Sequence, residues 1–339
     1  MTSENPGENL SHHGDRDMAP GMVDFAVNVW LPAPPRWLRD RLAAALDRLA
    51  AYPSAEDDRM AREAVARRHG RSPDEVLVLN GSAEGFALLP NLRPRLAAVV
   101  HPSFTEPEVA LRTAGVPVHR VMLDGDYVLR PERVPAEADM VVIGNPTNPT
   151  SVTHPAALIR QLAAPGRLIV VDEAFMDAIP GEPESLAGEP GALVFRSLTK
   201  TWGLAGLRAG YVLGDPRTLA RLAFDRPQWP VGTLVLEAVA ACCSPGAVAE
   251  AEAEARAITG YRETFVTALR DAGIEVVAEP TAPFVLIRVD GGAAVREALR
   301  AKKIAVRRGE TFPGLTADHI RLAVRPPAQT APLLKEFTT

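Results

Sequence analysis

Residues 197–208 read Ser-Leu-Thr-Lys-Thr-Trp-Gly-Leu-Ala-Gly-Leu-Arg and place Lys200 between two apolar runs. The runs at 193–197 and 210–213 predict buried strands, because short apolar segments bounded by turn residues are typical of a covered sheet. Lys200 therefore lies in a loop at a strand end, where the ligands of α/β sheets collect. A lysine there can form an imine with an aldehyde cofactor. Most lysines are simply solvated, so the neighbouring segments decide the interpretation.

Two segments carry groups suited to a phosphate. Ser197 supplies a hydroxyl donor and Arg208 a guanidinium fork at the two ends of the quoted stretch. A second segment, Asn-Gly-Ser-Ala-Glu-Gly, follows the strand predicted at 76–79 and opens a helix. Unpaired amides at a helix start can bind an anion, although a Gly-Ser start is also a common cap. The residues of this start are Ser82, Ala83 and Glu84.

Loops after other predicted strands carry a carboxylate, an amide and an aromatic ring. Asp172 ends the apolar run 168–172, where an acid can keep a pyridinium nitrogen protonated. Asn148 follows the run 140–144 in a turn with a doubled Asn-Pro, from which an amide can reach a phenolate oxygen. Phe104 begins another such loop and can stack on a pyridine ring. Each residue alone is compatible with a cap, a turn or a core position, so the signal lies in their combination.

The remaining pattern predicts an α/β fold in two parts. Apolar runs that alternate with helical stretches up to residue 243 predict a sheet flanked by helices. A long Ala/Glu-rich helix and four further strand candidates then predict a smaller α/β domain. The first forty residues are proline-containing and show little periodicity, which indicates an arm. We divide the chain into an N-terminal arm (1–40), a large domain (41–243) and a small C-terminal domain (244–339).

Composition limits the function classes. The chain has 339 residues, 47% of them hydrophobic, and a net charge of −5 without blocks of like charge, so neither nucleic acid nor a membrane is an expected partner. The adjacent Cys242 and Cys243 support neither a disulfide framework nor a metal site. No Gly-x-Gly-x-x-Gly opens a helix after the first strand, which argues against a dinucleotide-dependent dehydrogenase. We see no signal peptide or long apolar run and expect a cytoplasmic protein.

The ordered set Asn148, Asp172, Lys200 and Arg208, with a late Arg321, resembles the class I and II aminotransferases of fold type I. The resemblance implies the cofactor pyridoxal 5′-phosphate (PLP) and a large domain with a central mixed, mostly parallel sheet. By the same resemblance Lys200 and Asp172 are the catalytic residues, one holding PLP as a Schiff base and the other pairing with its ring nitrogen. Asn148 would bind the phenolate, Arg208 the cofactor phosphate, and Arg321 the substrate carboxylate.

Nearly the whole chain resembles one branch of that family, which contains histidinol-phosphate aminotransferase and L-threonine-O-3-phosphate decarboxylase. Its marks include His13-Gly14 and Tyr52-Pro53. In this branch the hydroxyl that corresponds to Tyr52 reaches the PLP phosphate of the neighbouring subunit, which implies a homodimer with shared active sites. The resemblance also implies cofactor contacts from Phe175 and Thr199, and substrate contacts from Asn28, Arg307 and Arg325.

Four segments, 102–106, 172–175, 306–315 and 321–325, look more like the decarboxylase than the transaminase. Phe104 and Phe175 are the telling residues in them, because transaminases usually have tyrosine at both places. We therefore expect decarboxylation of L-threonine-O-3-phosphate, a step of cobalamin biosynthesis, ahead of transamination of histidinol phosphate with 2-oxoglutarate. A third alternative is a protein of this fold that binds PLP without catalysis. The arm departs from the usual sequence of this branch at two places: Trp30 and Leu31 stand where it has Asn-Pro, and Asp15 stands where it has a glycine. In this branch the arm covers the substrate, so these changes bear on which substrate is bound.

Overall fold

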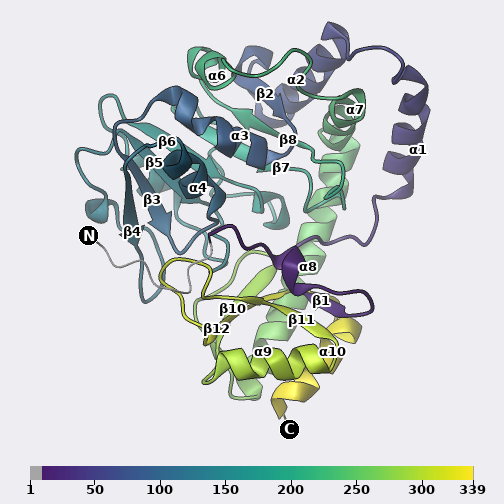
Figure 1. Ribbon diagram of the computed structural model, residues 1–339. Coiled ribbons are helices and arrows are strands. Elements are labelled where there is room, and N and C mark those ends of the chain that lie inside the picture. The colour runs from purple at the N-terminus through teal and green to yellow at the C-terminus, as the bar shows by residue number, and fades with distance from the viewer. Residues whose placement is uncertain (1–9, 339) are drawn as a thin grey trace.

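The computed structural model describes residues 10–338, which form two lobes joined by the long helix α8 (Pro245–Asp271) (Figure 1). The upper lobe in Figure 1 is built on a seven-stranded sheet and the lower lobe on a five-stranded sheet. Residues 1–9 of the predicted arm lie outside the described residues. The predicted α/β fold class, with a large and a smaller unit, is confirmed.

The large sheet has the strand order β2-β8-β7-β6-β5-β3-β4. In this described sheet, β8 runs antiparallel to both of its neighbours, and the pairs from β7 through β4 are parallel. Six of the strands coincide with predicted apolar runs. The sequence does not predict β4, because polar residues interrupt this partly exposed edge strand. The strands are β2 (Val76–Leu79), β3 (Ala97–His101), β4 (Val118–Met122), β5 (Met140–Gly144), β6 (Leu168–Asp172), β7 (Ala192–Ser197) and β8 (Gly210–Leu213).

Helices cover both faces of the large sheet, which explains why its strands are apolar on both sides. Neighbouring residues of one strand enter different cores: Val141 packs into the core beneath α1, α2, α5, α7 and α8, and Val142 into the core beneath α3, α4 and α6. Helix α2 begins with a capping box between Ser54 and Asp57. The helices are α1 (Arg36–Ala45), α2 (Ala55–His69), α3 (Ser82–Leu88), α4 (Glu106–Thr113), α5 (Ala156–Arg160), α6 (Pro216–Leu222) and α7 (Thr233–Cys242).

The small sheet has the order β1-β11-β12-β10-β9 and packs against α8, α9 (Gly292–Ala301) and α10 (Pro327–Thr338). Its edge strand β1 (Val23–Phe25) comes from the predicted arm and pairs in parallel with β11. The arm is thus partly a strand of the small lobe, and three residues are too few to show a strand period. The other strands are β9 (Glu275–Val276), β10 (Phe284–Arg288), β11 (Ile304–Arg308) and β12 (His319–Ala323).

Short 3-10 helices punctuate the loops, and one of them, η1 (Gly14–Asp17), turns the arm across the junction between the lobes. Within residues 10–338 no single helix is long and apolar enough to cross a membrane. Helices α7 and α8 meet those criteria only as a pair, and they are bent by 70° at their junction. The further 3-10 helices are η2 (Leu46–Arg48), η3 (Pro73–Glu75), η4 (Leu89–Leu92), η5 (Pro131–Arg133) and η6 (Met176–Ala178).

Candidate active site

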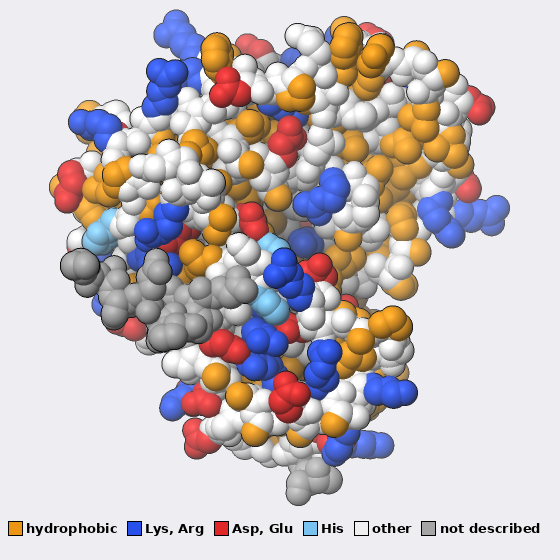
Figure 2. Space-filling view, in the orientation of Figure 1, with side chains coloured by type: hydrophobic (Ala, Val, Ile, Leu, Met, Phe, Trp, Pro, Cys, Tyr) orange, Lys and Arg blue, Asp and Glu red, His pale blue; other side chains and the backbone are white. Residues whose placement is uncertain are grey.

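A cavity of about 530 Å³ lies at the carboxyl ends of the central parallel strands, between the two lobes. Figure 2 shows histidine side chains beside Lys or Arg side chains on the surface where the lobes meet. The strand ends of β5, β6 and β7 supply its floor, which is where an α/β sheet concentrates ligand-binding groups. The predicted site residues that line it are Asn28, Ser82, Ala83, Phe104, Asn148, Asp172, Phe175, Ser197, Thr199, Lys200, Arg208, Arg307 and Arg321.

Lys200 and Asp172 have shifted pKa values because both are desolvated inside this cavity. Burial lowers the pKa of Lys200 to about 8, helped by the positive charges of Arg321 and Arg208 and opposed by the charge of Asp172. Burial raises the pKa of Asp172 to about 6, although the amide of Ala174 donates to Oδ1 at 3.1 Å and Lys200 favours the ionised form. Near neutral pH the carboxylate is therefore ionised, and a useful fraction of the amine is neutral.

The rate at which the apoenzyme couples to PLP is expected to rise with pH through a midpoint near 8 rather than 10.5. Only the neutral amine attacks an aldehyde, so the rate follows the fraction of Lys200 without its extra proton. Stopped-flow absorbance on PLP addition across this range measures it. The matched variant Arg321→Met should move the midpoint upward, because a positive charge that lowers the pKa is removed. A midpoint near 10.5 in the wild type would contradict this view.

Asn148 is oriented by Arg321, which reaches it from β12 of the small lobe. The guanidinium Nη1 donates to Asn148 Oδ1 at 2.6 Å, and Nη2 donates to the carbonyl of Ala26. Because a guanidinium cannot accept a hydrogen bond, the amide oxygen must face Arg321 and the Nδ2 donor is left for the cavity. Arg321 is 5% exposed, and burial together with the charge of Arg307 lowers its pKa to about 9.

A buried histidine holds the turn that carries Asn148. The backbone amide of Leu129 donates to His154 Nδ1 at 3.1 Å, so the ring proton must be on Nε2. Nε2 then donates to Thr147 Oγ1 at 2.9 Å, and that hydroxyl donates to the carbonyl of Gly144 at 2.8 Å. Burial lowers the pKa of His154 to about 4, which keeps this neutral form at ordinary pH. The chain of bonds thereby fixes the turn after β5.

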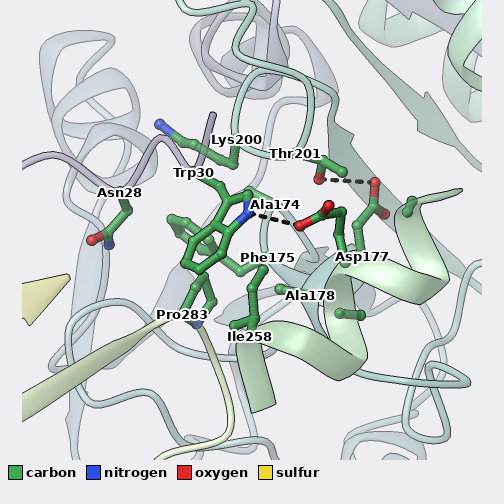
Figure 3. Close-up of a pocket in the computed structure, with 13 residues that line it drawn as sticks. Asn28, Trp30, Ala174, Phe175, Asp177, Ala178, Lys200, Thr201, Ile258 and Pro283 are labelled. Carbon is green, nitrogen blue, oxygen red and sulfur yellow. Dashed lines mark hydrogen bonds between the residues drawn. The ribbon is translucent and has the colours of Figure 1, made fainter. Parts of the chain in front are cut away.

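A buried ionic network ties the ends of β6 and β7 together. Thr201, next to the lysine, donates to Asp177 Oδ2 at 3.3 Å (Figure 3). Arg196, 1% exposed, donates both to Asp177 and, at 3.1 Å, to Oε2 of Glu173, which directly follows the catalytic aspartate candidate. The network therefore joins Thr201 and Glu173, the residues that follow Lys200 and Asp172 in the chain, and it pairs the buried guanidinium of Arg196 with carboxylates.

The turn before α3 lies against Arg208. Gly81 has φ +77°, and a Cβ built there would stand 3.1 Å from Arg208 Nη2, so the guanidinium occupies the space beside this turn. The hydroxyls of Ser82 and Ser197 line the same end of the cavity. A guanidinium, hydroxyls and helix-start amides together make a phosphate cradle.

Three predicted site residues do not line the cavity. Glu84 turns away to Arg226, at 3.0 Å, and its Oε2 accepts from the amide of Asn80 at 2.6 Å, so it braces the turn before α3. Arg325 donates to the carbonyls of Asp24, at 3.1 Å, and Val27, at 2.7 Å, and so holds the arm. Tyr52 is 74% exposed and stacks on Trp229 with ring centroids 4.2 Å apart, outside this cavity. Position in the chain alone does not distinguish a residue that lines a site from one that supports it.

The outer wall contains residues outside the predicted site set. His13 Nε2 lies 2.6 Å from Glu106 Oε1, so the arm is tied to α4 across the cavity. Arg307 donates Nη2 to the carbonyl of His12 at 2.7 Å and lies over the ring of Phe312. The His13-Gly14 motif is the sequence signal that this part of the arm lines the site. No sequence pattern identifies Glu106 as the partner of His13.

Trp30, which stands where the resembling branch has asparagine, places its indole beside the loop that carries Lys200, here called the lysine loop (Figure 3). Its Nε1 donates to Glu254 Oε2 on α8 at 3.0 Å, and its backbone amide donates to the carbonyl of Lys200 at 3.1 Å. Together with Phe175 and Ile258 it borders a void of about 20 Å³, so little space remains on this side of the lysine. Trp30 thereby anchors the arm segment that carries Asn28.

The cavity fits PLP. Polar atoms that are buried without a hydrogen-bond partner among residues 10–338 include both amide atoms of Asn28 and Nε of Arg321, and such atoms require a partner from a bound molecule or from water. The phosphate cradle at Arg208 and the carboxylate of Asp172 line one cavity with Lys200, and the ring of Phe104 offers a stacking surface. These residues match the charge at each end of the cofactor and the aldehyde between them.

Comparisons with known proteins agree with this site. The family model "Aminotransferase class I and II" matches residues 20–337. A histidinol-phosphate aminotransferase of Mycobacterium tuberculosis is 56% identical over 317 residues, which cover 93% of this chain and 87% of the relative. A threonine-phosphate decarboxylase of Salmonella typhimurium is 29% identical, over 92% of this chain and 89% of the relative. The crystal structure of histidinol-phosphate aminotransferase from Clostridium acetobutylicum shares the fold, with a TM-score of 0.86 at 22% identity, covering 94% of this chain and 98% of the other. Because the family model spans nearly the whole described chain, the protein belongs to the class I and II aminotransferases, a family of PLP-dependent enzymes.

Proposed function

We propose that the protein is an aminotransferase for a phosphate-bearing amino donor of the histidinol-phosphate type, with a 2-oxo acid such as 2-oxoglutarate as acceptor. The observation that carries the proposal is the 56% identity to a histidinol-phosphate aminotransferase over 93% of this chain. The threonine-phosphate decarboxylase relative is 29% identical. This difference favours the alternative over the decarboxylase that Phe104 and Phe175 lead us to expect first. A likeness in four short segments, including these two aromatic positions, is a weaker guide than identity along the whole chain.

The two arginines of the cavity suit both substrates of such a reaction. Arg321 and Arg307 are 5% and 3% exposed, and both line the cavity. A donor phosphate and an acceptor carboxylate are both anions that a guanidinium fork binds in the same geometry. Nη1 of Arg307 is buried without a hydrogen-bond partner among residues 10–338, as is Nε of Arg321, so each has a donor in reserve. One pair of cations therefore serves the two half-reactions in turn.

The remaining site residues position the cofactor and move a proton. PLP, when bound, supplies an electron-withdrawing ring that stabilises negative charge at the substrate α-carbon. Asp172 holds the proton on the ring nitrogen, and the Nδ2 group of Asn148 donates to the phenolate oxygen. Lys200 Nζ, with its lowered pKa, accepts the α-proton from the substrate. The buried network of Arg196, Glu173 and Asp177 joins the chain segments that follow the amine and the carboxylate.

The test is a direct choice between substrates. Holoenzyme is incubated with histidinol phosphate and 2-oxoglutarate, and separately with L-threonine phosphate, while glutamate and carbon dioxide are measured. Glutamate from the first mixture and no carbon dioxide from the second supports the proposal. Carbon dioxide from the second alone would restore the decarboxylase, and silence in both with PLP bound would favour a binding protein.

Arg208→Ala should weaken PLP binding roughly 10- to 100-fold, the range for one charged hydrogen bond to a phosphate. The guanidinium is partly open to solvent, so the lower part of that range is expected. PLP titration of the apoenzyme by absorbance measures the change, and excess PLP should restore most of the turnover. The matched variant Arg217→Ala, also an exposed arginine of the large lobe, should bind PLP like the wild type. Equal affinity of Arg208→Ala and the wild type would remove Arg208 from the cradle.

We further propose a homodimer in which Tyr52 reaches the cofactor phosphate of the neighbouring subunit. Tyr52 and Trp229 are stacked, 74% and 53% exposed, and do not line the cavity of their own chain. Two large exposed aromatic rings in contact are typical of an interface. Tyr52→Phe is expected to weaken PLP binding about tenfold without changing the dimer mass in light scattering. A fully active monomer would exclude this arrangement.

A further inference from the structure

A second cavity, of about 190 Å³, lies in the small lobe behind the turn η1. Its wall is formed by η1, helix α9 and strand β11, and it does not include the residues of the PLP site. We propose that this cavity, the arginine hollow, binds the dianion of inorganic phosphate or of a phosphate monoester at a site separate from the active-site cavity. Four arginines line it, namely Arg16, Arg296, Arg300 and Arg308.

Two of these arginines have little to bind within the protein. The side chain of Arg300 donates Nη1 to the backbone carbonyl of Asp17 at 3.2 Å. No acceptor for the guanidinium of Arg16 is found among residues 10–338. Each guanidinium carries five N–H donors, so most of the donors of both residues remain for a ligand. Both residues line the hollow and are exposed.

The other two arginines are held in place by carboxylates. Arg296 donates Nη1 to Glu310 at 2.8 Å, and Arg308 donates Nε to Asp17 at 3.2 Å. These contacts use one fork edge of each guanidinium and fix its position, as a preformed anion site requires. Figure 2 shows Lys and Arg side chains on this face of the lower lobe, with Asp and Glu side chains between them.

The charges that line the hollow are unbalanced. Four arginines stand against the carboxylates of Asp17 and Glu297 in the lining and that of Glu310, which binds Arg296 beside it, so one positive charge is left over. Like charges collected in one concave wall raise the local positive potential and attract a dianion. The wall is predominantly polar, so an apolar ligand is not accommodated there. A phosphate group with a small organic substituent suits both the volume and the donors.

The arginine hollow adjoins the active-site cavity through η1. Gly14 and Asp15 of this turn face the active-site cavity, whereas Arg16 and Asp17 face the hollow. The carboxylate of Asp17 binds Arg308 and lies 3.6 Å from Nη1 of Arg307, which lines the active-site cavity. Asp17 therefore contacts one arginine of each cavity.

Equilibrium dialysis of the holoenzyme with radiolabelled inorganic phosphate tests the site. The variant Arg16→Ala/Arg300→Ala removes two guanidinium groups without leaving a carboxylate unpaired. Wild type should bind one equivalent of phosphate per chain more than this variant, with the difference shrinking as salt rises. The matched control Arg39→Ala/Arg217→Ala removes the same charge from exposed helix positions elsewhere and should bind like the wild type. Equal binding by the wild type and the first variant would overturn the proposal.

Two further measurements keep the result interpretable. If the double variant has a disturbed circular dichroism spectrum, Arg300→Ala alone replaces it, with an affinity at least about tenfold weaker expected at the hollow. Glycerol 3-phosphate that displaces the extra equivalent assigns the hollow to monoesters, and failure to displace it assigns the hollow to the free ion. Because the readout is a difference between proteins, phosphate bound at the active site cancels, and the outcome does not depend on which amino donor the enzyme uses.

Discussion

Lys200→Ala is expected to lower kcat by roughly 10⁴-fold or more, the upper range of what a positioned general base contributes. The variant loses both the amine that couples to PLP and the group that takes the substrate proton. The amine lies in the cavity, and because its pKa is lowered to about 8, part of it is neutral and able to accept a proton near neutral pH. Turnover of the PLP-saturated variant, and mass spectrometry after borohydride reduction, measure the two losses separately.

The lysine on the surface at position 302 supplies the control. Lys302 pairs with Glu336 on α10 and does not line the cavity, so Lys302→Ala should keep both turnover and the reduced PLP label. Wild-type protein should carry the label on Lys200. A Lys200→Ala protein that retains the label in equal amount, or turns over within tenfold of the wild type, would show that another amine performs both tasks.

Asp172→Asn is expected to reduce kcat by about 10³-fold while PLP stays covalently attached. The carboxylate has a pKa of about 6, so it is ionised at neutral pH and can hold a proton on the ring nitrogen. An amide of the same size has no charge with which to do so, and general acid–base and electrostatic terms of this kind are worth about 10²–10⁴-fold. The measurement is kcat with saturating substrates, alongside the borohydride label.

Glu173→Gln is the matched control, because it changes the adjacent carboxylate, which does not line the cavity. Glu173 accepts from Arg196 at 3.1 Å and from the amide of Leu186 at 2.7 Å. Its loss should lower the melting temperature more than it lowers kcat, since it leaves a buried guanidinium short of a partner. If both variants lower kcat equally, Asp172 acts through the fold and not on the cofactor.

The strands of the large sheet could be predicted because helices cover both faces, so each strand reads as a continuous apolar run. The loops after β5, β6 and β7 could be predicted as one candidate site, because the carboxyl ends of parallel strands meet at one edge of the sheet and the polar residues that follow these runs occur in combination. The edge strand β4 could not, because one side of it is open to solvent and its residues alternate. β1 could not either, because a pairing of three residues depends on β11, about 280 residues later.

Residues that support the site without lining it are harder to predict from the sequence. Glu84 and Arg325 carry the same chemistry as residues that bind ligands, and only their partners, Arg226 and the arm carbonyls, show that they brace the structure. His154 has no motif at all, and its role depends on a backbone amide 25 residues away in the chain. Sequence patterns report what a side chain can do, whereas the direction in which it points is set by long-range packing.

The arm belongs to two parts of the molecule at once. β1 completes the sheet of the small lobe, while Thr105 of the large lobe donates to the carbonyl of Leu10, and Trp30 is held by α8 and by the lysine loop. The segment between these anchors also forms a wall of the active-site cavity. Any substitution there is therefore tested by selection for stability and for substrate choice together. We therefore expect a new substrate specificity to arise by paired changes: one residue alters the cavity wall, and another restores the contacts between the arm and the two lobes.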